Sequence, residues 1–590
     1  LPAVESRLPG IRNEGFLATN ELINGVPQRS DWNDARSKAE NAVNKSGESL
    51  LAKLGFNVDR HDQATSILKT DDKKMAVAVL LKNYESPELS SERFTSLTPV
   101  SYALHVADQE RLPYVIIVQE NKIRLYPVDS AKGVGRRGRT ETFIEVHTGL
   151  LTDDMSAYLW LIFSSEALLP NGSLDNLLDD SGRFSGELAK ALRERIYNDV
   201  IPRLCKGIVA DRNIKNPTTK ELNEIYEMAM NILFRLLFIA YAEDKDLLPY
   251  KWNGLYQKRS LKTKALEILE IISNEIEYDD GTTHWKEIKR LFNAIDSGNT
   301  EWGVPAYGGE LFSKDPSVSN IGALVSELSL PNTIFGSVLE NLLLINSEEG
   351  LGPVDFRSLG VREFGTIYEG LLESELSVAE TDLTLDKEGY YKHSKENEDP
   401  LVKSGEVYLH NSSGARKSTG TYYTKTFAVD HLLDRSLIPA MNEHFERLDQ
   451  LGDDEAGDKF FDFKVADIAM GSGHFLINAI DKMEIGFASY LANRQLPSIQ
   501  FDLNELKNAA YHALGPFKDQ VEIEDTQILR RLIVRRCIYG VDLNETAVQL
   551  TRLGIWIHTF VPGLALSFLD HNFIQGNSLI GVGQIEEVKE

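Results

Sequence analysis

The sequence predicts an α/β fold combined with extensive α-helical structure, in a chain of 590 residues. Two patterns carry this prediction. Short apolar stretches alternate with helical periods in residues 1–165 and again in residues 401–590, whereas residues 166–400 keep a helical period almost throughout. Apolar stretches of ~4–8 residues indicate strands, and apolar positions three and four apart indicate a helix face. Because single cores seldom exceed ~250–300 residues, we expect three domains with these boundaries.

Residues 1–165 have the pattern of an α/β module. The expected elements are a helix over 34–54, a strand over 75–82, a helix over 99–107 and a hairpin formed by 114–119 and 122–128. The segment Lys132–Arg139 is rich in glycine and arginine. It is predicted to be a flexible basic loop, which either contacts phosphates or forms a solvated loop tip.

Residues 166–400 are predicted to form a helical connector domain. Apolar residues recur along 225–241 over a face too wide for a surface helix. The apolar run Met228–Ala242 contains Asn231 and Arg235, so we expect a buried bundle helix and no membrane span. The glutamates that follow are expected to be solvated or held in structural contacts. Thr381–Lys403 is rich in charge and is expected to form a loop or an exposed hairpin.

The chain is strongly acidic, with a net charge of −26 and a pI near 5.0. This excludes a chain-wide basic nucleic-acid clamp, so any DNA contact must come from local basic patches. The two cysteines, Cys205 and Cys537, have no spacing that suits a disulfide scaffold or a zinc site, and they fit the reducing cytoplasm. The most basic cluster of the C-terminal half either contacts DNA or, more readily, pairs with acids. It consists of Arg530, Arg531, Arg535 and Arg536.

A short apolar stretch at Val465–Ala469 is followed by Gly471-Ser-Gly473 and by an apolar helical run from Phe475. This order is typical of a strand, a tight glycine turn and a helix N-terminus. Glycine allows the sharp turn and the close approach of a ligand to the backbone, and free amides at the helix start face that ligand. The turn therefore indicates a nucleotide-cofactor pocket, although such turns also end ordinary strands.

A second strand, Ile538–Asn544, carries Asp542 near its end, where a carboxylate can accept hydrogen bonds from both ribose hydroxyls. A dinucleotide site would need a third glycine where Leu476 stands. Asp467 on the first strand would repel a diphosphate but suits the cationic amino acid end of S-adenosylmethionine. The ligand charge therefore favours the methyl donor.

These stretches resemble the motifs of the large adenine-specific DNA methyltransferases of type IIG restriction-modification systems and of their BREX and DISARM phage-defence relatives. Ala466–Phe475 is similar to the first cofactor motif, with Ile468 for its usual proline and Met470 for its cysteine. Gly540–Asn544 is similar to the second and Phe573–Gly581 to the third. Arg416–Thr424 resembles the motif ahead of the cofactor core, although Lys425 replaces a proline. Arg235–Pro249 and Phe364–Glu373 are similar to the family's helical connector.

The resemblance implies that residues 401–590 form the first part of a Rossmann-like methyltransferase core that binds S-adenosylmethionine without a metal. Hydroxyls and amides around Ser418–Thr424 can bind the methionine carboxylate, and a tyrosine there can pack on the cofactor. The expected cofactor-binding residues are Thr419, Tyr422, Tyr423, Thr424, Asp467, Ala469, Gly471, Gly473, Phe475, Asp542, Leu543 and Asn577, the last in place of the common aspartate.

The catalytic residues are not assigned. Transfer to an exocyclic amine requires a motif such as Asn/Asp-Pro-Pro-Tyr/Phe, but none of the 20 prolines is followed by another proline. We therefore expect the catalytic and target-reading portions beyond Glu590. No proline precedes Cys205 or Cys537, which excludes transfer to cytosine carbon within this portion.

The family often carries an N-terminal nuclease of the PD-(D/E)xK type. Asp72 and Lys82 could be two members of such a site, but Leu80 occupies the position of the metal-binding acid. We therefore expect a degenerate nuclease-like or docking module in residues 1–165.

The resemblance implies a site-specific DNA methyltransferase that modifies adenine N6, with cytosine N4 as the next choice, in a bacterial restriction-modification or anti-phage system. Double-stranded DNA is the expected partner, and other subunits of a defence complex are further candidates. One alternative is a bifunctional type IIG restriction endonuclease and methyltransferase. A second alternative is a non-catalytic scaffold subunit.

Overall fold

The computed structural model describes the chain except for residues 1–6, 136–137, 348–349, 361–362, 366, 368–370, 372–373, 388, 396–398, 412–423, 425, 568 and 581–590. The chain divides into two compact units. Unit 1 comprises Leu1–Leu188, Arg357–Glu363 and Asp481–Gln500. Unit 2 comprises Ala189–Phe356, Phe364–Ile480 and Phe501–Glu590. Each unit combines segments that are far apart in the sequence, whereas the three predicted domains are continuous stretches. The three-domain division stays a prediction.

Unit 1 is built around a seven-stranded sheet with the strand order β1-β7-β6-β5-β4-β3-β2. The β4 and β5 pair is parallel, and every other neighbouring pair is antiparallel. The strands are β1 Ile11–Glu14, β2 Asn57–Arg60, β3 Ser66–Thr70, β4 Lys73–Leu80, β5 Tyr114–Gln119, β6 Lys122–Pro127 and β7 Phe143–His147. The helices are α2 Trp32–Val43, α3 Gly47–Lys53, α4 Pro99–Glu110, α5 Ser156–Phe163 and the start of α6 Ser173–Arg195.

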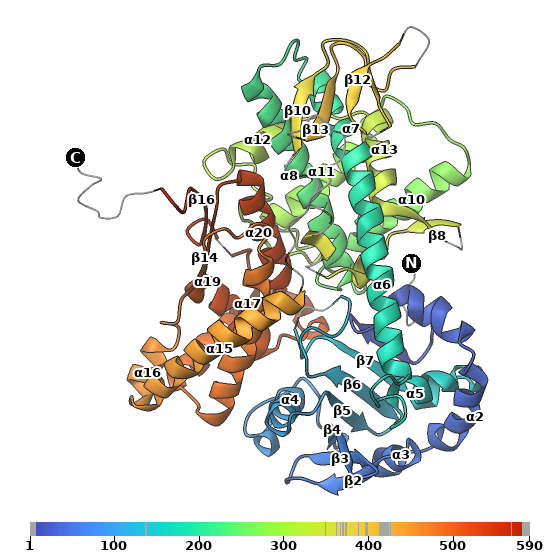
Figure 1. Ribbon diagram of the computed structural model, residues 1–590, viewed down its shortest axis with the longest axis vertical. Coiled ribbons are helices and arrows are strands. Elements are labelled where there is room, and N and C mark those ends of the chain that lie inside the picture. Colours follow the sequence, from blue (N-terminus) through green and yellow to red (C-terminus); the bar gives the residue numbers. More distant parts are fainter. Residues whose placement is uncertain are drawn as a thin grey trace. The chain divides into compact units, whose positions relative to one another are not determined.

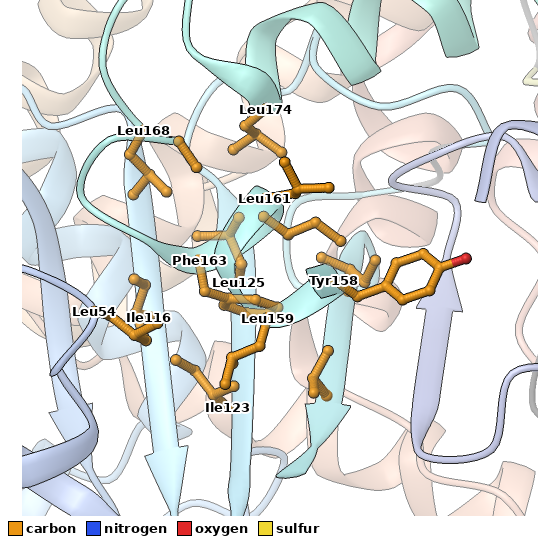
Figure 2. Close-up of a cluster of buried hydrophobic side chains, with 14 of the residues drawn as sticks. Leu54, Ile116, Ile123, Leu125, Tyr158, Leu159, Leu161, Phe163, Leu168 and Leu174 are labelled. Atoms are coloured by element: carbon orange, nitrogen blue, oxygen red, sulfur yellow. The ribbon is translucent and has the colours of Figure 1, made fainter. Parts of the chain in front are cut away.

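Both faces of this sheet are covered, because residues alternate between the faces along each strand. Ile116 and Val118 of β5 join the core formed with α2, α3 and α5, and Figure 2 shows Ile116 in this cluster with Leu159 and Phe163 of α5. The intervening residues Val115 and Ile117 join a second core beneath α4. In Figure 1 the blue sheet accordingly has α4 on one side and α2, α3 and α5 on the other.

The predicted elements of unit 1 are largely confirmed. The predicted hairpin is β5 and β6, paired antiparallel across residues 120 and 121. The predicted strand over 75–82 is β4, and the helix over 99–107 is α4, which starts at a proline and is capped by the Thr98 hydroxyl. The single helix expected over 34–54 is wrong, because α2 ends at Val43 and α3 starts at Gly47 with a φ of +55°. A positive φ interrupts a right-handed helix.

Unit 2 contains a helical part and a small parallel sheet. Its first elements are α7 Ile201–Asp211, α8 Thr219–Asp244, α9 Gly254–Gln257, α10 Leu261–Ser273, α11 Thr283–Ser297, α12 Asn320–Glu327, α13 Asn332–Leu343, β8 Leu344–Ser347, β9 Gly350–Pro353, β10 Ser374–Val378, β11 Leu383–Leu385, β12 Tyr391–His393 and β13 Val407–Asn411. The pair β11 and β12 forms an antiparallel hairpin with mostly exposed or half-buried residues, which confirms the expectation for Thr381–Lys403.

The central helix of this part is α8, as its wide apolar face predicts. It begins with a capping box between Thr218 and Glu221. Its one buried cation, Arg235, donates a 2.8 Å hydrogen bond to the carbonyl oxygen of Leu311, and burial lowers its pKa to about 10. Among the described residues α8 alone has the length and apolar character of a membrane span, but 89% of its most apolar segment is buried inside the protein. The prediction of a buried helix is confirmed.

The C-terminal elements of unit 2 form the parallel sheet and its helices. They are α15 Thr426–Asp449, α16 Asp453–Lys459, β14 Val465–Asp467, α17 His474–Asn493, α18 Pro497–Leu514, α19 Asp525–Cys537, β15 Ile538–Asp542, α20 Glu545–His558 and β16 Phe573–Gln575. The later part of α17 and the start of α18 lie in the segment Asp481–Gln500, which belongs to unit 1. The strand order is β14-β15-β16, and both pairs are parallel. A strand that leads through a loop into a helix is repeated at β14–α17 and β15–α20, in agreement with the expected Rossmann-like core.

Candidate cofactor site

The carboxyl ends of β14 and β15 lie next to each other, because the two strands are parallel and Asp467 is opposite Gly540. The glycine turn leaves β14 and passes along the end of β15. The amide of Met470 donates to the carbonyl oxygen of Val541 at 3.2 Å, and the amide of Gly471 donates to Oδ2 of Asp542 at 2.9 Å. Two segments about 70 residues apart in the sequence therefore form one binding edge.

The two glycines of the turn have different structural roles. Gly471 and Gly473 have φ angles of +54° and +78°, which L-residues with a side chain rarely adopt. A Cβ at Gly473 would lie 2.8 Å from Cγ2 of Thr551 in α20, so this glycine allows close helix packing. A Cβ at Gly471 would meet no atom within 4 Å. Gly471 therefore leaves open space in front of the turn, where a ligand can approach the backbone.

The Asp467 carboxylate is half buried beside the turn and accepts a 3.1 Å hydrogen bond from the amide of Ala469. Burial raises its pKa above the ordinary value, and the negative charge of Asp542 raises it further. Because two carboxylates repel each other across the same edge, the site favours a positively charged group between or near them.

Asp542 also shapes the start of α20. Its Oδ1 accepts the amide of Asn544 at 2.9 Å, and the Asn544 side chain in turn caps α20 by accepting from the amide of Thr546 at 2.8 Å. Each Asp542 oxygen thus accepts one backbone amide and retains capacity for a second donor. Two apolar side chains beside this edge are exposed, Leu543 at 68% and Ile468 at 59%. They offer a surface for a flat apolar ligand group.

Helix α20 is held in place by buried polar contacts. The Thr551 hydroxyl donates to the carbonyl oxygen of Gly471 at 2.9 Å. Arg552 forms ion pairs with Glu310 at 2.7 Å and Asp570 at 3.0 Å, and it donates to the carbonyl oxygen of Phe573. Burial raises the pKa of Glu310 to about 7, with the contact to Asp570 as a further cause. These contacts fix α20 to the glycine turn and to β16.

The predicted site residues divide into three groups. The structure brings together Asp467, Ala469, Gly471, Gly473, Asp542 and Leu543 at the ends of β14 and β15. Phe475 is half buried in the first turn of α17, and Asn577 lies in the turn after β16, where its side chain accepts the amide of Leu579 at 2.9 Å. Thr424 is exposed just before α15. The residues outside the described part of the chain are Thr419, Tyr422 and Tyr423.

Sequence reasoning missed Thr551, which is completely buried and binds the glycine turn directly. A signal was present, because Thr551 lies three residues after Val548 and four before Ile555, on the apolar face of a predicted helix. A hydroxyl at such a position must find a hydrogen-bond acceptor when it is buried.

Comparison with known proteins gives one relevant relative. No family model matches the chain. A Methanocaldococcus jannaschii protein, provisionally named a type II restriction enzyme and methyltransferase, is 23% identical over 397 residues, which are 62% of this chain and 28% of that protein. The chain is similar to a restriction-modification protein. It spans less than a third of that relative's length.

A structural comparison matches the cryo-EM structure of the DrdV–DNA complex. The match covers 93% of this chain and 40% of that chain, with 12% sequence identity and a TM-score of 0.22. This score is too low to support a conclusion about fold or function.

The structure places Asp72 and Lys82, the two possible members of a nuclease site, at opposite ends of β4. Asp72 lies in the turn between β3 and β4, whereas Lys82 follows the other end of β4. The eight residues of β4 separate them by about 25 Å at the usual strand rise. Another acid, Asp62, lies at the Lys82 end of β4. It precedes Ser66, the first residue of β3, which pairs with Ala78 near the end of β4. Within the described part of the chain, no group of three or more acidic, histidine or cysteine side chains could hold a metal.

Several cations of the two predicted basic patches make contacts within the protein, and Arg136 and Arg137 of the first patch lie outside the described residues. In the segment Lys132–Arg139, Lys132 donates to the Tyr114 hydroxyl at 2.8 Å, and Arg139 pairs with Asp108 at 2.8 Å. These contacts tie down both ends of the predicted flexible loop.

In the arginine cluster of α19, Arg530 and Arg531 are buried and donate to backbone carbonyls of His558 and Ala565. Arg536 pairs with Asp502 at 3.2 Å, which is one of the expected pairings with an acid. Arg530 and Arg531 therefore hold α19 in place, whereas Arg535 and Arg536 are exposed.

Proposed function

We propose that this chain forms the cofactor-binding part of a site-specific DNA methyltransferase of the restriction-modification type, which transfers methyl from S-adenosylmethionine to adenine N6. The main support is the pair of carboxylates, Asp467 and Asp542, on either side of the glycine turn. The similarity to a protein named a restriction enzyme and methyltransferase gives independent support for this class.

The described residues fit this cofactor chemically. Asp542 would accept the ribose hydroxyls with its free lone pairs, and Asp467 would attract the ammonium of the methionine end. The open space at Gly471 allows the cofactor to contact the turn, and the exposed Leu543 would pack on the adenine ring. A diphosphate would instead meet two half-buried negative charges.

S-adenosylmethionine would supply a methyl group on a positively charged sulfur, so the transfer to an amine would need positioning and charge compensation more than a metal. The two carboxylates would hold the cofactor's ends and orient it. The adenine target, double-stranded DNA as substrate and any partner subunits belong to the proposal for the whole protein.

Calorimetric titration with S-adenosylmethionine tests the cofactor site. Asp542→Ala should weaken binding by about tenfold or more, because charge-assisted hydrogen bonds to both hydroxyls would be lost. Asp454→Ala is a matched control, since Asp454 is an exposed carboxylate in α16 of the same unit. Unchanged affinity in Asp542→Ala would reject the proposal. Mass spectrometry of DNA for N6-methyladenine tests the reaction itself.

A second candidate is a bifunctional restriction endonuclease and methyltransferase. The one observation in its favour is that the relative's name contains the words restriction enzyme beside methyltransferase. It requires magnesium-dependent DNA cleavage that is lost in Lys82→Ala. Leu80 at the position of the acid argues against this activity.

A further inference from the structure

A cavity of about 290 Å³ lies in the helical part of unit 2, between the start of α10 and one face of α11. Its volume is at the lower end of the range for small-molecule pockets, roughly 300–1,000 Å³. Its lining contains four cationic side chains and two carboxylates, which leaves two positive charges in excess. This excess is notable in a chain whose net charge is −26.

The cations of the cavity are not equivalent. Lys264 is only 6% exposed and forms ion pairs with both carboxylates of the cavity, Glu267 and Glu287. Its charge is therefore already compensated. The positive excess comes from the three other cations, which are exposed around the cavity. They are Lys258, Arg259 and Arg290.

One of these three cations is positioned for a ligand by contacts with the protein, and the other two make no such contacts among the described residues. Arg259 donates to the carbonyl oxygen of Leu255 at 3.1 Å, and its guanidinium lies 5.1 Å from the ring centre of Trp302. Lys258 and Arg290 have side chains without an ion pair or hydrogen bond in the part of the chain that the structure describes.

The start of α10 does not itself supply an anion site. The amides of Leu261 and Lys262 donate to the buried carboxylate of Glu243 at 3.0 and 2.9 Å. The next amide, of Thr263, donates to the Ser260 hydroxyl. Because these amides are already satisfied, any anion in the cavity must be bound by the side chains.

We propose that this cavity binds a phosphate group through Arg290, Lys258 and Arg259. A guanidinium matches phosphate oxygens with parallel N–H donors, and a lysine adds a mobile charge. A metal cation is disfavoured by the positive excess, and a monocarboxylate would compensate only part of it. The phosphate could belong to a DNA backbone or to a free phosphorylated molecule, and these two sources share the same binding chemistry.

Titration of the full chain with inorganic phosphate and with pyrophosphate, followed by calorimetry at low salt, tests the proposal. Arg290→Ala and Lys258→Ala should each weaken binding by about tenfold, the usual effect of losing one charge-assisted hydrogen bond. Lys286→Ala is the matched control, because Lys286 is an exposed cation on the same helix outside the cavity. Equal binding by the wild type, Arg290→Ala and Lys286→Ala would overturn the proposal.

A second titration with duplex DNA distinguishes the two sources. For a backbone phosphate, the double variant Lys258→Ala/Arg290→Ala should bind DNA more weakly and show a shallower dependence of log K on log salt, by about one to two contacts. For a free phosphorylated molecule, DNA binding should not change while pyrophosphate binding is lost. Affinity for S-adenosylmethionine should be unaffected in all these variants, so this inference and the proposed function fail independently.

Discussion

The buried hydroxyl of Thr551 donates a 2.9 Å hydrogen bond to the carbonyl oxygen of Gly471, so α20 holds the glycine turn from behind. The turn is held from its other side by Asp542, which accepts the Gly471 amide. The amide and the carbonyl oxygen of Gly471 are thus both bound by residues of the β15–α20 segment. The proposed cofactor edge is therefore rigid only when both strand–helix pairs, β14–α17 and β15–α20, are folded.

Thr551→Val should weaken S-adenosylmethionine binding while leaving the fold intact. Valine keeps the shape of threonine but removes the donor, so the turn loses a contact that contributes about 1 kcal/mol. We expect roughly a fivefold loss of affinity by calorimetry, with Thr551→Ser close to the wild type because it retains the hydroxyl. Equal affinities for the valine and serine variants would show that the hydroxyl does not position the turn.

Gly473→Ala should destabilise unit 2 more than Gly471→Ala. Both residues have a positive φ, which costs an alanine about 1 kcal/mol, but only the Gly473 substitution also meets Thr551 at 2.8 Å. Thermal unfolding should therefore show the larger shift for Gly473→Ala. Adding Thr551→Ser removes the methyl group in contact, and it should recover part of the loss. Additive effects of the two substitutions would contradict this packing explanation.

The pH dependence of cofactor binding should report the carboxylate pair. Binding of the cationic methionine end requires ionised Asp467, whose pKa is raised by burial and by the Asp542 charge. Affinity should consequently fall on acidification at a higher pH than for an ordinary aspartate. Asp542→Asn removes the neighbouring charge, so the fall should move to lower pH, even though the overall affinity is reduced. Calorimetric titrations across the acidic range measure both midpoints.

Glu243 should make the stability of unit 2 decrease as the pH rises from about 4.5 to about 7. Burial raises its pKa from 4.5 to about 7, although it accepts two amides of α10 and the Tyr256 hydroxyl. The folded state then binds the proton more tightly than the unfolded state, so stability is highest below the unfolded pKa and is lost through this window. The loss amounts to roughly 3 kcal/mol.

Glu243→Gln should flatten this part of the pH profile, because an uncharged side chain takes the place of the titrating one. Chemical denaturation at pH 5 and pH 8 gives the comparison, with Glu270→Gln as a control at an exposed position of α10. A wild-type profile that is as flat as that of Glu243→Gln would contradict the raised pKa.

DNA incubated with magnesium should stay intact both with the wild-type protein and with Lys82→Ala. The position of the metal-binding acid holds Leu80, and Asp72 is at the wrong end of β4. Electrophoresis of DNA incubated with the wild type and with the variant should therefore show no difference. Cleavage by the wild type alone would instead establish the bifunctional enzyme.

The sequence by itself determined the strands, the glycine turn and the acid that follows the second strand. These features depend on local chemistry, since apolar runs favour strands and glycine alone adopts the turn's backbone angles readily. Asp467, Gly471 and Asp542 were therefore predicted correctly as neighbours in the fold. The break after Val43 was missed because the helical period of 34–54 continues across it.

Only the tertiary structure decided which distant groups meet. The role of Thr551, the capping of α10 by Glu243 and the separation of Asp72 from Lys82 depend on packing and strand direction, which no local pattern encodes. The same reason applies to the basic cluster of α19, where Arg530 and Arg531 are buried and donate to backbone carbonyl oxygens. A charge in the sequence shows what a residue can bind, and its burial decides what remains for it to bind.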